Sequence, residues 1–187
     1  MSRKLLLAGA IVVAALGSGC SIVAPQYSSS MQNVQKLKDA GNTPAKVGEF
    51  GSRQAPENAN PISLRGSSLV SPYASSYANY LGEAIKQELT LAGRLTSNAD
   101  IEVSGVLLKN DINVSGFSVG YGDIEARFVV KKGGRVTYDQ TKSAHTEWES
   151  AFAGPIAIPR GRDEYPRLVQ QLLAVLYTDK TFLEALQ

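Results

Sequence analysis

Three β-strands are predicted by the stretch IEVSGVLLKNDINVSGFSVGYGDIEARFVVKKGGRVTYDQTKSAHTEW, residues 101–148. Apolar and polar residues alternate in three parts of this stretch, which is the pattern of strands that bury one face. In the first part, the apolar residues Val103 and Leu107 have odd numbers, whereas the later apolar residue Ile112 has an even number, so the alternation changes parity between them. A slip of one residue turns every side chain to the other face, so we expect a β-bulge near Leu108–Asp111.

The second and third strands are expected to form a hairpin around Gly133-Gly134. A loop of only these two residues would set Phe128 opposite Asp139, which makes a poor core face. A three-residue loop that also takes Lys132 sets the same side chain opposite Tyr138. Three-residue hairpin loops commonly end in a left-handed glycine, so we predict the three-residue loop.

Two amphipathic helices flank these strands. The first is predicted over residues 71–93, with Ser71 as its N-cap and Gly93 in a left-handed C-cap. The second is predicted from about Asp163 onward, followed by one more short helical turn that Thr178 or Asp179 would cap. In both, apolar residues recur at three- and four-residue spacing, which predicts one buried face.

One further strand, Ala45–Phe50, precedes the first helix, and Ile62–Leu64 alternates like an edge strand. The element order is therefore β-α-β-β-β-α. Two helices on one face of a four-stranded, mostly antiparallel sheet form the simplest two-layer arrangement that buries these apolar faces. The sequence predicts an α+β two-layer sandwich of this kind, as a single domain over residues 44–187.

The amino terminus has the composition of a secretory signal peptide. Arg3 and Lys4 precede an apolar run from Leu5 to Leu16, and small residues follow. An apolar run of about 7–15 residues after a positive start is typical of such peptides, whereas a membrane-spanning helix needs about 20. We therefore predict a signal peptide over residues 1–19. The alternative, a permanent anchor helix, would need a longer apolar run.

The single cysteine of the chain, Cys20, directly follows this segment. Its surroundings resemble the lipobox of bacterial lipoproteins, although the leucine lies one position too far back, at Leu16. In lipoproteins this cysteine carries acyl chains such as palmitate, and two or more such chains hold a protein stably on a membrane. The alternative is cleavage by an ordinary signal peptidase, which would release a soluble periplasmic protein. By resemblance to sorted lipoproteins, Ser21 indicates the outer membrane, with the domain facing the periplasm.

Residues 20–43 are predicted to be the lipidated amino terminus and a tether. The stretch contains many Ser, Gly, Pro and Asn residues with weak patterning. As a random coil it would span about 27 Å, enough to carry the domain clear of the lipid headgroups. The alternative is that a short amphipathic turn, Met31–Leu37, packs on the domain.

The charge of the chain gives no reason to expect a nucleic-acid partner. Removal of Arg3 and Lys4 with the signal peptide leaves 17 of the 19 basic residues, equal to the 17 acidic ones. A chain without net charge lacks the electrostatic attraction on which nucleic-acid binding depends. No run of five like charges marks a basic membrane patch either.

No constellation for catalysis or metal binding is recognisable in the sequence. His145, the single histidine, falls on the predicted solvent-facing parity of its strand. Glu147 and Glu149 share that face, but no pocket is predicted that would shift the pKa of a carboxyl group. One histidine and one cysteine cannot make the usual structural zinc sets. We therefore expect no catalytic residues, no metal, no cofactor and no enzymatic activity.

An apolar loop is predicted after the last strand, over Ala151–Pro159. Its prolines stiffen the backbone, so less entropy should be lost on binding, and exposed apolar patches often mark interaction sites. Flanking Trp and Arg are residue types common in interfaces. The predicted partner-binding set is Trp148, Phe152, Ile156, Ile158 and Arg160. The alternative is that these side chains fold inward and close one end of the core.

The chain resembles small envelope lipoproteins of Gram-negative bacteria. The resemblance lies in the lipobox-like Cys20, the strand AKVGEF, the helix YANYLGEAIKQELTLAG and the closing strand–loop–helix. The chain is most similar to the YajG-like lipoproteins, and more distantly to the LPS-assembly lipoprotein and the auxiliary lipoproteins of lipid-transporting ABC systems. Over residues 44–187 this resemblance implies a non-catalytic domain that docks on another envelope component.

Two functions follow as hypotheses. The first is a non-enzymatic outer-membrane lipoprotein that acts as an accessory in an envelope assembly or transport complex, and so has another envelope protein as partner. The alternative is a periplasm-facing lipoprotein that itself binds lipid, glycan or peptidoglycan. A deep apolar pocket between helices and sheet would favour the alternative, whereas an exposed apolar patch without such a pocket would favour the first.

Overall fold

The computed structural model describes residues 20–187, so the predicted signal peptide lies outside the described residues. The largest feature is a four-stranded sheet with the strand order β2-β5-β6-β7. Its strands span Ala45–Ser52 (β2), Ile101–Asn113 (β5), Val119–Lys132 (β6) and Arg135–Glu149 (β7). β2 runs parallel to β5, and the other neighbouring strands are antiparallel. The predicted four-stranded, mostly antiparallel sheet is confirmed.

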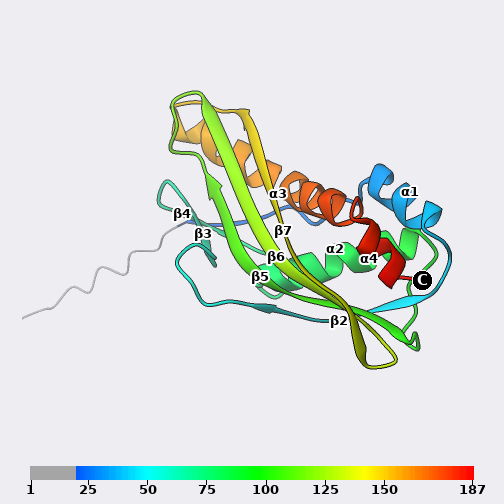
Figure 1. The fold of residues 1–187 in the computed structure, drawn as a ribbon. Coiled ribbons are helices and arrows are strands. Elements are labelled where there is room, and N and C mark those ends of the chain that lie inside the picture. The colour runs from blue at the N-terminus through cyan, green and yellow to red at the C-terminus, as the bar shows by residue number, and fades with distance from the viewer. Residues whose placement is uncertain (1–19) are drawn as a thin grey trace, which may run out of the picture.

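Helices cover one face of this sheet (Figure 1). The two long helices are α2, Tyr77–Leu91, and α3, Gly154–Leu176, and the short α4, Lys180–Ala185, follows at the carboxyl terminus. The core lies between helices and sheet and has an aromatic centre. There the rings of Tyr80 and Tyr165 meet edge to face, with centroids 5.0 Å apart. The α+β two-layer class is confirmed.

A second, three-stranded sheet lies at the end of the molecule opposite the carboxyl terminus (Figure 1). β1, Ser21–Val23, runs parallel to β4, Ser67–Val70, which pairs antiparallel with β3, Ile62–Leu64. The strand predicted at residues 62–64 therefore exists, but it pairs within this small sheet. Within residues 20–187, no helix has both the length and the apolar character needed to cross a membrane.

Residues 20–43 are not a free tether. After β1 the chain forms helix α1, Met31–Asp39, and the side chains of Val34 and Leu37 are buried. The Tyr27 hydroxyl is buried as well and donates a hydrogen bond of 2.6 Å to Glu88 of α2. The tether prediction is wrong, and the alternative of a docked Met31–Leu37 segment holds. Tertiary packing stabilises this short helix, which would be marginal in isolation.

α2 begins later than predicted. Its N-cap is Ser76, whose hydroxyl accepts a hydrogen bond from the Asn79 amide, and not Ser71. Ala74 and Ser75 have positive φ angles of 51° and 54°, a conformation that a right-handed helix cannot contain. The other end agrees with the prediction, since the glycine that follows the helix has a φ of 74°.

α3 begins earlier than predicted, at Gly154 instead of about Asp163, so most of the predicted loop Ala151–Pro159 is helical. The sequence predicted the helix only from about Asp163 and left Pro155 and Pro159 in a loop, because a proline inside a helix removes a backbone hydrogen bond. Close packing on the sheet outweighs this cost. Gly161 is buried, and a Cβ at that position would lie only 2.5 Å from Val114 of the facing strand segment.

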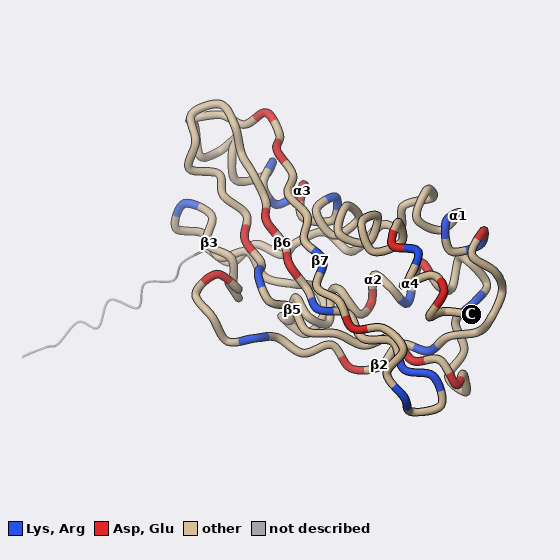
Figure 2. The backbone as a smooth tube through the Cα atoms, viewed as in Figure 1, with Lys and Arg blue, Asp and Glu red and all other residues tan. Residues whose placement is uncertain are grey.

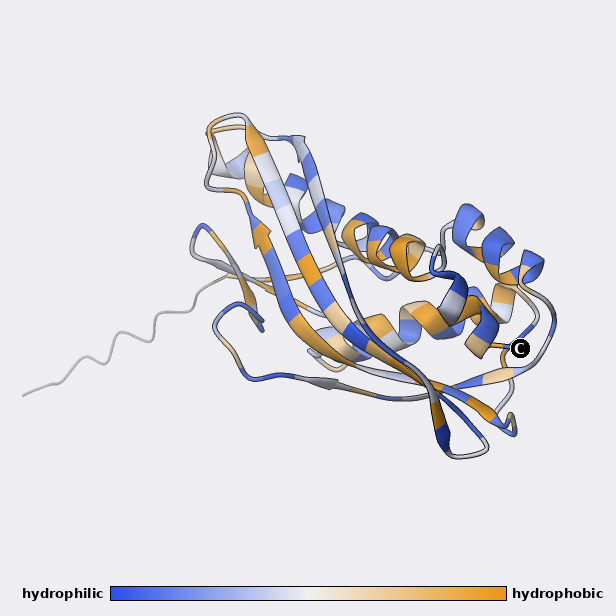
Figure 3. Cartoon of the chain, in the orientation of Figure 1, coloured by the Kyte–Doolittle hydropathy of each residue, from blue (hydrophilic) through white to orange (hydrophobic). Residues whose placement is uncertain are grey.

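The bulge predicted in β5 is present, as a register shift between Leu107 and Lys109. It brings the apolar residues on both sides of the shift to the buried face, among them Val103 and Ile112. Figure 3 shows the resulting alternation of apolar and polar residues along the long strands. The local sequence signal, a change of parity, was sufficient for this prediction.

The predicted hairpin register is wrong. The β6–β7 loop has two residues, Gly133-Gly134, whose φ angles of 55° and 80° suit a type I′ turn. A bulge between Val130 and Lys131 then shifts the ladder and sets Val130 opposite Tyr138. The sequence argument assumed an unbroken ladder, and the extra residue of the bulge is what returns Tyr138 to the buried face.

Candidate functional site

Cys20 is exposed and directly precedes β1 of the small sheet. This sheet lies at the opposite end of the molecule from the carboxyl terminus (Figure 1). The Cys20 carbonyl oxygen accepts a hydrogen bond of 3.0 Å from the Ser68 amide, and the next residue, Ser21, already belongs to β1. No spacer therefore separates the cysteine from the folded domain. A group attached to its sulfur would be held close to the turn between β3 and β4.

Arg65, in that turn, ties it to two other connections at the same end. Its Nε donates to the Val114 carbonyl at 2.7 Å, and its Nη2 donates to the Gly116 carbonyl at 3.0 Å. Its Nη1 donates to the Phe152 carbonyl. One side chain thus joins the β3–β4 turn, the β5–β6 turn and the β7–α3 connection.

The connections that Arg65 joins carry exposed apolar side chains. The rings of Phe117 and Phe152 are stacked with centroids 5.1 Å apart, and their exposed fractions are 78% and 66%. Val119 and Ile156, which flank the same two connections, are also exposed. We call Phe117, Val119, Phe152 and Ile156 the apolar tip. Contiguous exposed apolar surface of this kind marks interaction sites in soluble domains.

Two residues of the predicted partner-binding set, Phe152 and Ile156, belong to the apolar tip. The other three are Trp148, Ile158 and Arg160. The Trp148 indole is buried and covers Gly120, where a Cβ would lie 2.6 Å from the ring. Ile158 packs partly buried against the core, and the Arg160 guanidinium donates to two backbone carbonyls at the end of β7. Partner binding by this set stays a prediction.

Arg65, Phe117 and Val119 were not among the residues predicted from the sequence to bind a partner. One signal that points to the two apolar residues is charge, since residues 112–122 and 150–159 contain no Asp, Glu, Lys or Arg. Figure 2 shows both connections as uncharged backbone at one end of the molecule. No local signal indicates that Arg65 meets them, because its hydrogen bonds reach residues at least 49 positions away in the chain.

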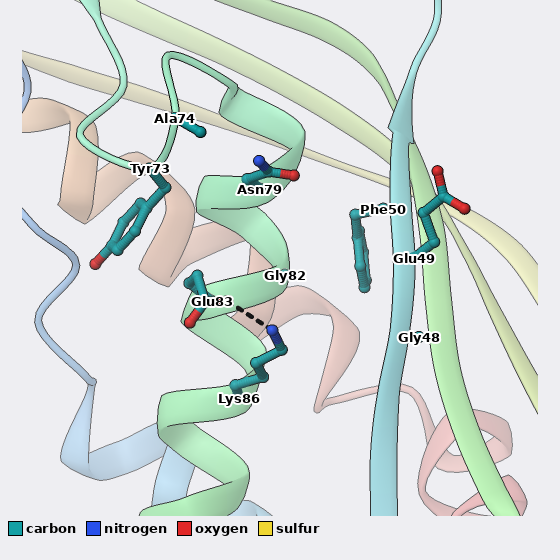
Figure 4. A pocket seen from close by; sticks show the side chains of 9 residues that line it. All are labelled: Gly48, Glu49, Phe50, Tyr73, Ala74, Asn79, Gly82, Glu83 and Lys86. Atoms are coloured by element: carbon teal, nitrogen blue, oxygen red, sulfur yellow. Dashed lines mark hydrogen bonds and ion pairs between the residues drawn. The ribbon is translucent and has the colours of Figure 1, made fainter. Parts of the chain in front are cut away.

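A second surface feature is a groove of about 390 Å³ between β2 and α2 (Figure 4). Its lining residues are Gly48, Glu49, Phe50, Tyr73, Ala74, Asn79, Gly82, Glu83 and Lys86. Phe50 points toward α2, where a Cβ on Gly82 would lie 3.3 Å from its ring, while Glu49 points away. The Lys86 ammonium and the Glu83 carboxylate form an ion pair of 2.6 Å along one wall.

The outer edge of β2 is open along this groove. Its ladder with β5 is interrupted between Val47 and Phe50. At its first residue, Ala45, the outer side pairs with the segment after α2. Over residues 46–52, the described part of the chain supplies no backbone partner on that side. An open strand edge is the feature to which an extended peptide can add as a further strand.

Four further grooves of similar size are open to the surface. The space between the helices and the main sheet is filled by side chains, including the fully buried Tyr77, Tyr80, Tyr165 and Phe128. Among the described residues 20–187, these buried side chains occupy the space in which a bound lipid would need a deep apolar pocket.

His145 is exposed on β7, as the strand parity predicted. Its ring nitrogens lie 3.0 Å from an Asp123 oxygen and 3.3 Å from a Glu147 oxygen. The hydrogen bond to Asp123, followed by that to Glu147, raises the His145 pKa above its usual value, because both favour the charged ring. We interpret the three as a solvated surface ion cluster. Across residues 20–187, no three His, Cys, Asp or Glu side chains are grouped to hold a metal ion.

Comparison with known proteins supports the fold. No protein-family model and no curated protein matches the chain. Among solved structures, protein XCC0632 of Xanthomonas campestris, which bears the family label DUF330, matches with a TM-score of 0.55 and 10% sequence identity. The match covers 84% of this chain and 95% of that one. At such low identity the likeness shows a shared fold and nothing further.

Two more solved structures are less similar. The hypothetical protein CT253 of Chlamydia trachomatis has a TM-score of 0.44 at 8% identity, over 72% of this chain and 92% of that one. A minor lipoprotein of Acinetobacter baumannii has a TM-score of 0.41 at 12% identity, over 73% of this chain and 90% of that one. These TM-scores are too low to support any conclusion, so the evidence for a shared fold comes from the Xanthomonas protein.

Proposed function

We propose that this chain is an outer-membrane lipoprotein, held by acyl chains on Cys20, that serves as a non-enzymatic accessory of an envelope assembly or transport complex. The observation that carries the accessory role is the open edge of β2 beside the groove on α2. This edge offers another envelope protein a place to bind, and the surrounding chemistry suits a peptide segment better than a small ligand.

An extended segment of the partner would add to β2 as a further strand. Hydrogen bonds to the free backbone groups of residues 46–52 would supply affinity, and alternate side chains of the segment would enter the groove. Phe50 and Gly82 give the groove an apolar floor, while Lys86 and Glu83 give it a charged wall. The backbone hydrogen bonds would accept a segment of any sequence, whereas the groove would select segments by their side chains.

Direct binding of lipid, glycan or peptidoglycan is the weaker candidate. A lipid-sized ligand is usually held in a concave, mostly apolar pocket that covers most of its surface. Here the interior is occupied by tyrosines such as Tyr77 and Tyr165, and the hollows are open grooves. Docking of a partner chain requires only the exposed edge and groove that are present.

Cys20→Ala is expected to abolish membrane attachment. The unsubstituted protein should partition into the detergent phase, and its amino-terminal peptide should carry the mass of the acyl chains. The variant should move to the aqueous phase or keep its signal peptide, because the acylated sulfur is gone. Ser21→Ala is the matched control and should remain in the detergent phase. An unsubstituted protein that is aqueous, with an unmodified amino-terminal peptide, would show that attachment at Cys20 is wrong.

Asn79→Trp is expected to reduce partner capture about tenfold or more, because a large side chain would fill the groove beside β2. Asn79 is an exposed lining residue, so the melting temperature should stay within about 2 °C of the unsubstituted protein. Thr90→Trp, at an exposed position of the same helix outside this groove, is the matched control. The measurement is the amount of the main co-purifying envelope protein. Equal capture by both variants would count against the β2 groove.

A further inference from the structure

We infer that the apolar tip lies in the membrane interface, so that the domain stands on the lipid leaflet that holds the acyl chains of Cys20. The inference rests on the proposed attachment at Cys20 and adds the orientation of the domain. The occupant of the tip is the bilayer itself, and not the partner protein assigned to the β2 groove.

The position of the anchor relative to the tip is the first argument. Cys20 is hydrogen-bonded to Ser68 without a spacer, and Arg65, three residues before Ser68, reaches the carbonyls of Gly116 and Phe152 in the tip connections. The acyl chains and the tip are therefore separated by a single turn. Figure 1 shows the small sheet with β3 and β4 at the same end of the molecule as the tip connections. A leaflet that holds Cys20 must pass close to the tip.

The chemistry of the tip is the second argument. Phe117 and Phe152 stack on each other and still expose most of their surface. Segments that lie in a membrane interface bury their apolar side about 5–10 Å into the boundary between headgroups and acyl chains. The uncharged residues 112–122 and 150–159 allow this, because a charged group taken out of water would oppose insertion strongly.

The charges around the tip fit a limited depth of insertion. Two cations border the tip. The guanidinium carbon of Arg65 lies 5.8 Å from the centre of the Phe152 ring, and the Arg160 guanidinium donates to the carbonyls of Glu149 and Ser150. Long basic side chains keep the cation at headgroup level while their stems cover apolar surface, and anionic headgroups attract the cation. Glu149 on β7 is exposed and pairs with Val119 of the tip in the ladder. Its carboxylate therefore belongs at headgroup level, which limits the deeper insertion to the residues beyond this pair, Phe117 and Phe152.

A test can be made with the mature chain, residues 20–187, and without the natural modification. Because Cys20 is the single cysteine, a maleimide-bearing lipid couples it to vesicles of phosphatidylethanolamine and phosphatidylglycerol. Phe117→Trp places a reporter in the tip. Val136→Trp is the matched control, since Val136 is an exposed apolar residue of the same hairpin, at the end far from the tip. Signal from the native, buried Trp148 is subtracted with the unsubstituted protein.

Brominated acyl chains should quench the reporter at position 117 at least about threefold more strongly than the control, because only the tip is expected to reach the acyl boundary. Emission of the reporter should also shift to shorter wavelength on coupling. No quenching, or equal quenching at both positions, would overturn the inference. A further contrary outcome combines two observations: on vesicles the reporter at position 117 stays in water, and in cells a photo-crosslinker at the same position forms an adduct with a protein. This combination would also overturn the inference.

The outcomes are separable from the proposed attachment. If the natural amino-terminal peptide carries no lipid mass, the attachment at Cys20 fails whatever the vesicles show. If the lipid mass is present but the coupled protein leaves position 117 unquenched, the attachment stands and the orientation fails. A third reporter, Ile156→Trp, repeats the measurement from the α3 side of the tip and guards against a local effect of the Phe117 substitution.

Discussion

Arg94→Ala is expected to lower the melting temperature by about 10 °C, or the free energy of unfolding by about 3–5 kcal/mol. The buried guanidinium of Arg94 donates to three backbone carbonyls, those of Leu37, Thr43 and Leu186. Two of these lie at the carboxyl ends of α1 and α4, where helices leave carbonyls without donors and where the helix dipole favours a cation. Truncation would leave all three acceptors without their donor and open a cavity.

The measurement is thermal and urea unfolding of residues 20–187, followed by circular dichroism. Arg167→Ala is the matched control, because that side chain is 71% exposed and its loss should cost within about 0.5 kcal/mol. Arg94→Lys should be intermediate, since an ammonium keeps the charge but lacks the rigid fork that reaches several acceptors. Equal melting temperatures for the Arg94→Ala and Arg167→Ala variants would contradict the prediction.

The free energy of unfolding of the unsubstituted protein is expected to fall as the pH rises, because of Glu88. In the Glu88→Gln variant this fall should be absent. Burial raises the pKa of the Glu88 carboxyl above its usual value of 4.5, against the hydrogen bonds that lower it, which come from Tyr27, Ser30 and Asn33. The folded protein therefore binds this proton more tightly than the unfolded chain. The free energy of unfolding should fall from about pH 4.5 up to the folded pKa and stay level above it.

Urea unfolding at several pH values up to about pH 8 measures this slope. The amide that Glu88→Gln introduces keeps an acceptor for the same donors and cannot titrate, so the profile of this variant should be flatter. Glu88→Ala should cost about 3 kcal/mol, because the buried Tyr27 hydroxyl and the Ser30 backbone amide lose their acceptor. Glu83→Gln, at a more exposed position of the same helix, is the matched control. An identical slope for Glu88→Gln and the unsubstituted protein would contradict the raised pKa.

Signals that extend over a few neighbouring residues predicted structure well. The parity change between Leu107 and Ile112 located a bulge, and Gly93 was placed correctly at a helix end. Of the two predicted caps of the last helical turn, Thr178 and Asp179, the structure has Asp179. Sequence signals whose effect competes with tertiary packing predicted the structure poorly. The prolines of α3 made the predicted helix begin too late, at about Asp163 instead of Gly154, and Gly134 suggested the wrong loop, because the cost of a proline or the choice of a turn is small beside the burial of a sheet face.

The candidate sites divide in the same way. Cys20 and the exposed Phe152 follow from residue type and position along the chain, whereas the stacking of Phe117 on Phe152 and the open edge of β2 depend on chain segments brought together by the fold. Trp148 illustrates the limit of residue-type reasoning. It has the chemistry of an interface anchor, but the close approach to Gly120 turns it into part of the core.

By itself, the sequence determined the α+β class, the buried parity of the long strands and the uncharged composition of the tip segments. Only the tertiary structure decided that residues 21–43 pack on the domain, that Arg65 gathers three connections next to Cys20, and that Arg94 closes the carboxyl ends of two helices. The physical reason is the distance along the chain over which each kind of interaction acts. Periodicity and caps report interactions within a turn or two, whereas burial and hydrogen-bond satisfaction are decided by groups that lie tens of residues apart and meet only in the folded chain.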